Sequence, residues 1–528
     1  MKSQVCALLA LASIGLASAS ETPGRVPTPA EIQTIVTEGK DKSQVMQRLR
    51  ELTNIGPRLT GSTNLSKAQN WAMGQFKKWG LKNVHLDEWG TIPVGFERGS
   101  KQSARMVEPF DSEIVFTTPA WTPGTKGKVR GQAFAMPTSM EELNKLRPQL
   151  KNSFILMPAR AGMRGATIPA DEINTELDKA GIAGRIAGAA DERVHTSGTW
   201  RDKTFEKRPT QTLFIVRKSD YERIARNIEY GRNPILELEA ENKWIKGPIK
   251  QYNVVAEIEG TDLKDEVVVI CGHLDSWNSP GSQGACDNGT GTVSAMESAR
   301  ILAASGLKPR RTIRFILWSG EEQGLLGSRA YVEKQKEGIE KFVAVLNDDG
   351  GTNYHGGYVG LESHRAILEK AFAPTLAAFP DLPMKFDAVA QDPAGGSSDH
   401  APFIWAGVPA YFTKESGRAD YGFVWHTQHD RYENAIPEYL VQSATNHALV
   451  VYHLATIDGK LERFPVRPRN SGAVVLNHAL AMGADRMYAD PHAHGSNDND
   501  HDHEDDYVLE IFDRLKRIAP QVMRAVAR

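Results

Sequence analysis

The sequence has little net charge, few cysteines and, after its first residues, no long apolar run. Its 63 basic and 65 acidic side chains leave a formal net charge of −2, which gives no support to binding of nucleic acid or of an anionic membrane surface. No later segment reaches the roughly 18 apolar residues that a membrane-spanning helix needs. We therefore expect neither a nucleic-acid partner nor a membrane anchor.

The N-terminus carries the features of a secretory signal peptide. Lys2 precedes an apolar run from Val5 to Ala17, and Ala17-Ser18-Ala19 has the small-x-small pattern of a cleavage site. The run is too short to span a bilayer. A buried first helix is the alternative interpretation. We predict cleavage after Ala19 and a mature protein that is secreted or periplasmic.

The length of the chain and its pattern of predicted strands and helices indicate more than one domain. A chain of 528 residues is too long for one typical hydrophobic core. Between residues 101 and 250, short strand-like runs alternate with Pro, Gly and Asn, which predicts an inserted β-rich domain. From Tyr252 onward strands and helices alternate, which favours a three-layer α/β fold with a mixed, largely parallel sheet. The predicted parts are residues 1–19 (signal peptide), 20–100 (first part of the main domain), 101–250 (insert), 251–465 (main part) and 466–528 (C-terminal tail).

The tail contains a run of His and Asp at residues 491–506 and an amphipathic helix pattern at 508–518. The run has too little apolar content for a core. Weak metal binding is conceivable, but nothing in the run fixes a ligand geometry. We interpret it as a solvated, mobile acidic loop.

Several predicted strands of the main domain end in metal-ligand side chains. The strand at 267–271 is followed by His273 and Asp275, and the glycine-rich loop after it supplies Asp287. Later strand ends and loops supply Glu321 and Glu322, Asp348 and Asp349, Asp399 and His400, and His426 and His429. Carboxyl ends of parallel strands meet at one edge of a sheet, where converging carboxylates repel one another unless a cation offsets them. Imidazole and carboxylate without thiolate suit zinc, and the surplus of carboxylates suggests two ions with a shared ligand.

Two cysteines would remain in the mature protein, because Cys6 leaves with the signal peptide. Cys271 and Cys286 each lie close to a proposed ligand. They are candidates for thiol ligands, small buried core residues or a disulfide permitted outside the cell. We favour buried core residues. A bridge is possible because both neighbourhoods must converge if His273 and Asp287 share a site.

The motifs around these residues resemble the M28 family of co-catalytic di-zinc exopeptidases. The matching pieces are Gly272-His-Leu-Asp-Ser276, Gly284-Ala-Cys-Asp-Asn-Gly289, Trp318-Ser-Gly-Glu-Glu-Gln-Gly-Leu-Leu-Gly-Ser328, Asn347-Asp-Asp349 and His426-Thr-x-x-Asp430. The stretches 55–61 and 71–89 also resemble the N-terminal part of that family, and the insert resembles a protease-associated domain. The resemblance extends from about residue 30 to about residue 463 and leaves out the tail.

The resemblance implies a role for each matching residue and a cofactor of two Zn²⁺ ions. His273 and Asp349 would bind the first ion, Glu322 and His426 the second, and Asp287, before a cis peptide to Asn288, would bridge them. Asp275 would support His273, and Glu321 would be the general base. Alignment with the family favours Asp349 over Asp348 and His426 over His429, whereas Asp399 reads best as a helix cap.

The implied function is that of an exported aminopeptidase that acts on the N-termini of peptides or proteins. A carboxypeptidase or dipeptidase of the glutamate carboxypeptidase type is the alternative, with Arg418 a candidate for the substrate carboxylate by position only. Acyl transfer of the glutaminyl-cyclase type uses one zinc ion, so the full ligand set argues against it. The same complete set argues against a receptor-like relative without catalysis.

Overall fold

The computed structural model describes residues 25–158, 169–390 and 398–466, all of which belong to one structural unit, Met1–Met487. The predicted signal peptide, the His/Asp-rich run and the C-terminal amphipathic helix lie outside these ranges. Within the described ranges, none of the helices combines the length and the apolar character that a bilayer crossing requires.

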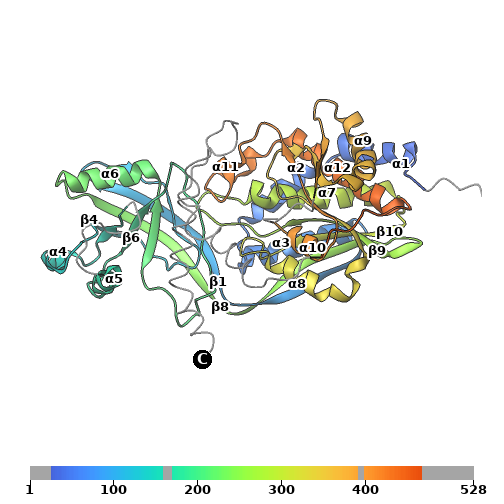
Figure 1. Cartoon of the computed structure of the whole chain (residues 1–528). Helices are drawn as coiled ribbons and strands as arrows, with labels where there is room; N and C mark the ends of the chain where they lie inside the picture. Colours follow the sequence, from blue (N-terminus) through green and yellow to red (C-terminus); the bar gives the residue numbers. More distant parts are fainter. Residues whose placement is uncertain (1–24, 159–168, 391–397, 467–528) are drawn as a thin grey trace, which may run out of the picture. The chain divides into compact units, whose positions relative to one another are not determined.

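One extended sheet organises the described chain (Figure 1). Its strands run in the order β15-β11-β9-β10-β8-β4-β5-β6-β7-β3, and β1 pairs with β8. The strands are β1 (Lys82–Glu108), β2 (Ser112–Glu113), β3 (Phe116–Thr117), β4 (Val129–Ala135), β5 (Phe154–Leu156), β6 (Gly184–Gly188), β7 (Thr212–Val216), β8 (Ile235–Ile258), β9 (Leu263–His273), β10 (Arg311–Trp318), β11 (Phe342–Asn347) and β15 (Ala410–Phe412), with β12 (Tyr354–His355), β13 (Gly357–Leu361), β14 (Lys385–Val389) and β16 (Glu415–Ser416) in two small separate sheets.

The main domain is built on the parallel strands β15, β11, β9 and β10. In β9 the side chains alternate between two cores, as the period of a strand requires. Val268 and Ile270 belong to the larger core, and Val267, Val269 and Cys271 to the smaller one. Burial on both faces explains why this strand is a continuous apolar run.

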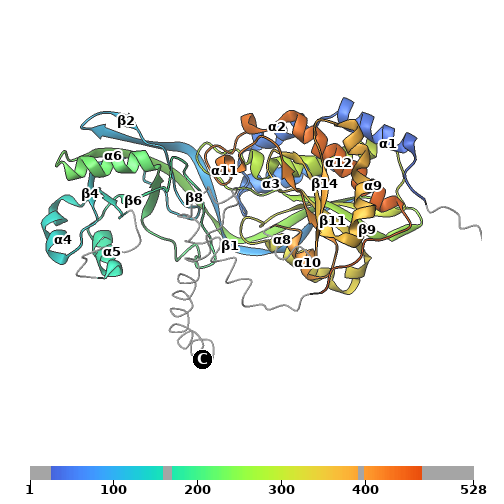
Figure 2. The same ribbon diagram turned by 45° about the horizontal axis from the view of Figure 1, so that its top comes forward.

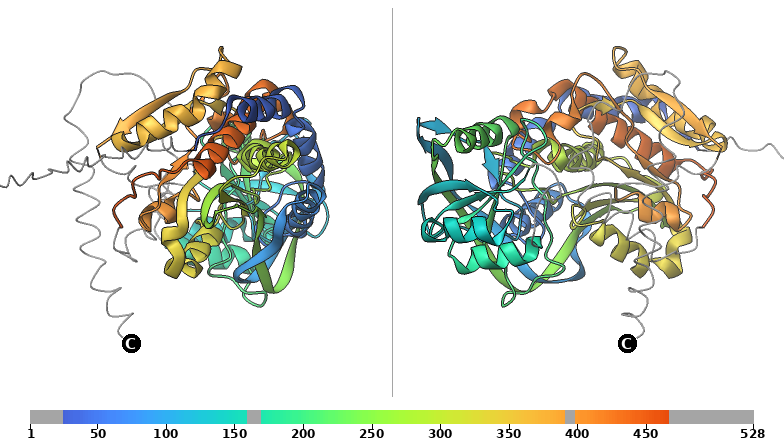
Figure 3. Two further views of the ribbon diagram at one scale, coloured as in Figure 1. Left: turned by 90° about the vertical axis from the view of Figure 1, so that its right-hand side faces the viewer. Right: turned by 60° about the vertical axis from the view of Figure 1, so that its left-hand side comes forward.

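Helices cover both faces of this sheet (Figures 1 and 3). The larger core contains residues of α1, α2, α3, α7, α9 and α12, and the smaller core contains residues of α8 and α10. The helices are α1 (Pro29–Val36), α2 (Val45–Ile55), α3 (Thr63–Lys78), α4 (Met140–Leu146), α5 (Ala170–Lys179), α6 (Lys218–Glu229), α7 (Thr290–Ser305), α8 (Leu326–Lys334), α9 (Arg365–Ala378), α10 (Ala401–Trp405), α11 (Tyr421–Val424) and α12 (Pro437–Thr456). The predicted three-layer α/β fold with a largely parallel sheet is confirmed.

Two long antiparallel strands, β1 and β8, connect the main domain to the insert (Figure 2). The last residues of β8 pair with β10 of the main domain, while its first residues pair with β4 of the insert. In the insert, β4, β5, β6 and β7 form parallel pairs. Helices α4, α5 and α6 belong to the same part of the chain.

Candidate metal centre

Three of the five predicted ligands, His273, Glu322 and Asp349, come from neighbouring strand ends of the main domain. His273 is the last residue of β9 and lies opposite Trp318, the last residue of β10. Asn347 ends β11 opposite Cys271. The residues that follow β10 and β11 therefore emerge beside His273, at the carboxyl edge of the sheet.

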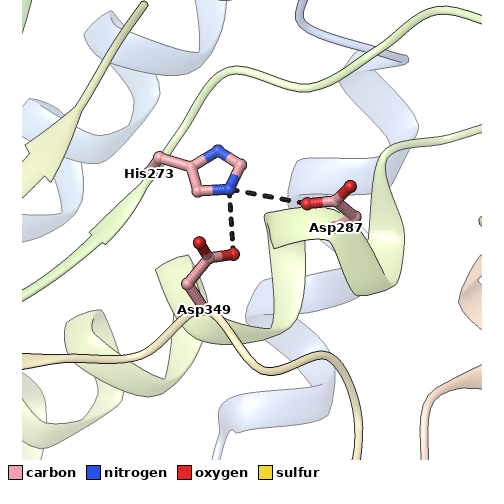
Figure 4. A group of neighbouring side chains, drawn as sticks. All are labelled: His273, Asp287 and Asp349. Carbon is pink, nitrogen blue, oxygen red and sulfur yellow. Dashed lines mark hydrogen bonds and ion pairs between the residues drawn. The ribbon is translucent and has the colours of Figure 1, made fainter. Parts of the chain in front are cut away.

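Two groups of side chains that could each hold a metal ion occur at this edge. In the first group, His273 Nε2 lies 3.0 Å from Asp349 Oδ1 and 3.5 Å from Asp287 Oδ1 (Figure 4). In the second group, His426 Nε2 lies 3.1 Å from Glu322 Oε2 and 3.2 Å from Asp287 Oδ2. The five predicted ligands are thus brought together, and Asp287 belongs to both groups.

Asp287 reaches both groups from a short helical turn, Ala285–Gly289, that precedes α7. Its φ of −120° and ψ of 95° depart from helical values, and the peptide bond to Asn288 is cis, as the resemblance implied. In Figure 4 its carboxylate points from this turn toward the ring of His273.

The residues of both groups fit a divalent cation. Asp287 Oδ2 and Glu322 Oε1 are buried and accept no hydrogen bond from the described part of the chain. Burial, together with the charge of Asp287, raises the pKa of the Glu322 carboxyl to about 7. Buried carboxylates with free oxygen lone pairs are costly unless a cation offsets their charge. Imidazole nitrogen and carboxylate oxygen are donors that zinc accepts.

The imidazole of His273 is oriented by the backbone. Its Nδ1 lies 2.9 Å from the carbonyl oxygen of Asp275, whereas the nearest carboxylate oxygen of Asp275 is 3.8 Å away. Donation from Nδ1–H to that carbonyl leaves Nε2 with its lone pair toward Asp287 and Asp349. The resemblance implied that the carboxylate of Asp275 orients His273, but the contact at hydrogen-bond distance is made by the main-chain carbonyl of Asp275.

The carboxylate of Asp275 links two other parts of the site. It accepts a hydrogen bond from the Thr60 hydroxyl at 2.6 Å and from the backbone N–H of Glu321 at 3.3 Å. Asp275 thereby fixes the turn that carries Glu321. Glu321 Oε2 lies 3.9 Å from His273 Nε2, so its carboxylate faces the first metal group. Burial and neighbouring carboxylates raise the pKa of Glu321 well above its usual value.

The two competing candidates lie outside the metal groups. The carboxylate of Asp348 lies 3.6 Å from His447 Nδ1, and burial raises its pKa to about 7. The ring of His429 stacks on Phe423 with 4.3 Å between ring centroids.

Asp399 does not cap a helix, and the cap interpretation was wrong. Helix α10 begins at Ala401 after His400, whose side chain makes no capping bond. The carboxylate of Asp399 is buried and accepts a hydrogen bond from the Ser328 hydroxyl. Both cysteines of the main domain are buried and free, so a disulfide between them is excluded and the core interpretation holds.

Two residues of the site had no role in the sequence analysis. Asp430 Oδ1 accepts hydrogen bonds from the backbone N–H groups of Cys286 at 2.5 Å and Asp287 at 3.4 Å, so it ties the loop of His426 to the bridging residue. Its position four residues after His426 in a quoted motif was the available signal. Burial raises its pKa to about 8.

Arg58 is the second such residue, and it is fully buried. Its guanidinium donates to the carbonyl oxygens of Leu274 at 2.6 Å, Gln283 at 3.1 Å and Gly284 at 2.6 Å. These carbonyls lie at the two ends of the loop between His273 and Asp287. A single arginine in a turn-rich stretch gave no sequence signal for this role.

Replacing Arg58 with methionine is expected to lower the free energy of unfolding by about 3–5 kcal/mol, because three buried carbonyls and nearby carboxylates lose their partner. Urea unfolding of the metal-free protein measures the effect. Arg226→Met, on an exposed position of α6, is the control and should change stability by less than about 0.5 kcal/mol. Equal stability of the two variants would contradict the role assigned to Arg58.

Comparisons with known proteins agree with this fold. The model of peptidase family M28 matches residues 253–451. Mouse carboxypeptidase Q is 29% identical over 438 residues, which cover 82% of this chain and 90% of that protein. A peptidase M28 precursor from Shewanella amazonensis superimposes with a TM-score of 0.60 at 23% identity, covering 82% of this chain and 98% of that chain. A zinc aminopeptidase from Bacillus subtilis has a TM-score of 0.50 at 20% identity, covering 83% and 99%.

Fold, site and relatives together define a metallopeptidase. Its substrates are accordingly peptides. The match to the family model and the similarity to the mouse relative support the predicted resemblance to peptidase family M28.

Proposed function

We propose that this metallopeptidase is an exported di-zinc aminopeptidase. The observation that carries the proposal is the pair of buried ligand groups that share Asp287, with Glu321 beside them. His273 and Asp349 would hold one zinc ion, and Glu322 and His426 the other. When bound, the two ions would polarise the carbonyl of the scissile peptide bond. They would also lower the pKa of the attacking water molecule, which makes it a better nucleophile.

Glu321 is the general base of the proposed reaction. Its carboxylate accepts a proton from the attacking water and returns it to the nitrogen of the leaving amine. Asp275 positions Glu321 through the backbone N–H at 3.3 Å. Adjacent Glu321 and Glu322 serve different purposes because the first faces His273 and the second faces His426.

The charge around the site favours a substrate amine over a substrate carboxylate. Buried acidic side chains near the proposed ligands are Asp275, Glu321, Asp348, Asp399 and Asp430. Arg418, the candidate for carboxylate binding, is instead exposed and pairs with Glu438 at 2.7 Å. Arg58 uses its guanidinium on three backbone carbonyls. An ammonium group at the substrate N-terminus suits such surroundings.

A carboxypeptidase or dipeptidase is the second candidate. The specific observation in its favour is the name of the mouse relative, carboxypeptidase Q, which is matched over 90% of its length.

Export of the protein is proposed from the signal-peptide pattern that ends at Ala19. The insert is proposed to be a protease-associated domain because its sequence is rich in strand-like runs.

Paired substrates separate the two candidates. We expect hydrolysis of aminoacyl-p-nitroanilides with kcat/KM at least about 100-fold above that of their N-acetylated forms, because the site accepts a free ammonium group. Unblocked, N-blocked and C-amidated dipeptides complete the set, with chelator-treated protein as the control. Cleavage restricted to substrates with a free carboxylate would overturn the aminopeptidase proposal in favour of the second candidate.

A further inference from the structure

The loop that carries His426 is held by a segment of the insert. Three hydrogen bonds cross from residues 193–196, here called the 193–196 segment, to residues 422–428. Thr196 N–H donates to the carbonyl oxygen of His426 at 2.9 Å. Val194 N–H donates to Gln428 Oε1 at 3.0 Å, and Arg193 Nη1 donates to the carbonyl oxygen of Gly422 at 2.6 Å. The contacts lie on both sides of His426 in the sequence.

His426 has a backbone conformation that needs such support. Its φ is +57°, in the left-handed region that residues with a side chain adopt uncommonly. Conformations of this kind persist where the surrounding structure fixes them. The carbonyl of His426 leaves the residue on the side of the insert and accepts the N–H of Thr196 there.

The 193–196 segment is itself fixed within the insert. The hydroxyls of Thr196 and Thr117 are hydrogen bonded at 2.9 Å and buried. The next residue, Ser197, accepts a hydrogen bond from Ala120 N–H at 2.8 Å through its carbonyl oxygen. On the other side of the segment, the carbonyl of Asp191 accepts from Lys218 N–H at 2.9 Å. The segment therefore gives His426 a rigid partner.

The far end of the loop is attached to the main domain instead. Asp430 accepts hydrogen bonds from Cys286 and Asp287 through its carboxylate, and its carbonyl oxygen accepts from Gln283 N–H at 2.8 Å. His426 thus lies between an attachment to the main domain and an attachment to the insert.

We propose that the 193–196 segment positions His426 as a metal ligand, so that the insert completes the second metal group. The proposal rests on the di-zinc site of the proposed function. Arg193 and Thr196 are positioning residues, because they act through the backbone of the loop and touch neither ion nor substrate. Without them the loop relaxes from the left-handed conformation, and the imidazole leaves its place beside Glu322 and Asp287.

Zinc titration of metal-free protein against a chelating dye tests this role in the full chain. We expect Arg193→Ala/Gln428→Ala, which removes the two side-chain links, to weaken binding of one of the two ions by about 10–100-fold and to leave the other unchanged. Thr196→Pro, which removes the backbone donor, should act in the same direction. The kcat of both variants should fall at limiting zinc and recover when zinc is raised, with little change in KM.

Arg185→Ala is the matched control. Arg185 has a similar side-chain exposure to Arg193, 13% against 18%, and pairs with Asp178 inside the insert. The Arg185→Ala variant should bind both zinc ions with the same affinity as the wild type. Unchanged zinc binding in the double variant, equal weakening of both ions, or activity that zinc does not restore overturns the positioning role and leaves the proposed function intact. A wild type that binds no second ion overturns both. If Thr196→Pro does not fold, the double variant decides.

Discussion

Replacing Glu321 with glutamine is expected to lower kcat by about 10²–10⁴-fold, the usual contribution of a general base. Glutamine has nearly the same shape but cannot take a proton from the attacking water. The backbone N–H that donates to Asp275 at 3.3 Å remains, so the turn should keep its place. Steady-state kinetics on an aminoacyl-p-nitroanilide measures the loss.

Metal binding separates a chemical effect from a structural one in this variant. Glu321 belongs to neither ligand group, so Glu321→Gln should retain as much zinc as the wild type. Its stability should not fall, because a buried carboxyl surrounded by other carboxylates becomes neutral. Glu337→Gln, on the exposed turn after α8, should keep wild-type activity. Glu321→Gln with near-normal kcat would remove Glu321 as the base.

Replacing Asp287 with asparagine should weaken metal binding at both groups. Its two carboxylate oxygens face different histidines, His273 at 3.5 Å and His426 at 3.2 Å. The amide removes a negative charge shared by both groups. We expect the affinity for each ion to fall by more than the roughly 10–100-fold that loss of an outer contact costs, and hydrolysis to fall with it.

Asp349→Asn is the comparison for this variant, because Asp349 belongs to the first group alone. It should weaken one ion and spare the other. Metal content after dialysis, together with zinc titration, distinguishes the two patterns. If Asp287→Asn and Asp349→Asn each release a single ion, the shared role of Asp287 is wrong.

The sequence predicted those strands whose apolar side chains indicate burial by themselves. Four apolar residues before Cys271 indicated a buried strand, and β9 is buried there. Three of the proposed ligands could be expected from the strands, because His273 ends β9 while Glu322 and Asp349 follow β10 and β11. Asp287 and His426 lie in a helical turn and after a helix, and only their motifs indicated them. The five proposed ligands indeed lie in two groups there.

Strands with small residues escaped prediction for a physical reason. Strand β4 reads Val-Arg-Gly-Gln-Ala-Phe-Ala and β6 reads Gly-Arg-Ile-Ala-Gly, patterns with low intrinsic strand preference. Gly131 is needed in β4 because a Cβ there would lie 1.9 Å from the carbonyl oxygen of Asn152. Such a requirement comes from a neighbouring segment, and no local pattern contains it.

Hydrogen bonds to backbone groups could not be predicted from the sequence either. Nδ1 of His273 lies 2.9 Å from the carbonyl oxygen of Asp275. The carbonyl oxygen of His426 accepts a hydrogen bond from the N–H of Thr196, which lies 230 residues earlier in the sequence. Carbonyl and N–H groups are present at almost every position. Their partners are therefore decided by the tertiary fold, not by residue type.

The paired strands β1 and β8 restrict how the insert could be removed or exchanged. Lys82–Glu108 and Ile235–Ile258 pair along their length and pass from the main sheet into the insert. A cut at residues 100 and 250 would sever both strands within this pairing and leave open edges that invite association with other chains. A chimera that carries a different insert therefore has to join its parent chains at the main-domain ends of this strand pair, near residues 82 and 258, where the donor brings its own strands whole.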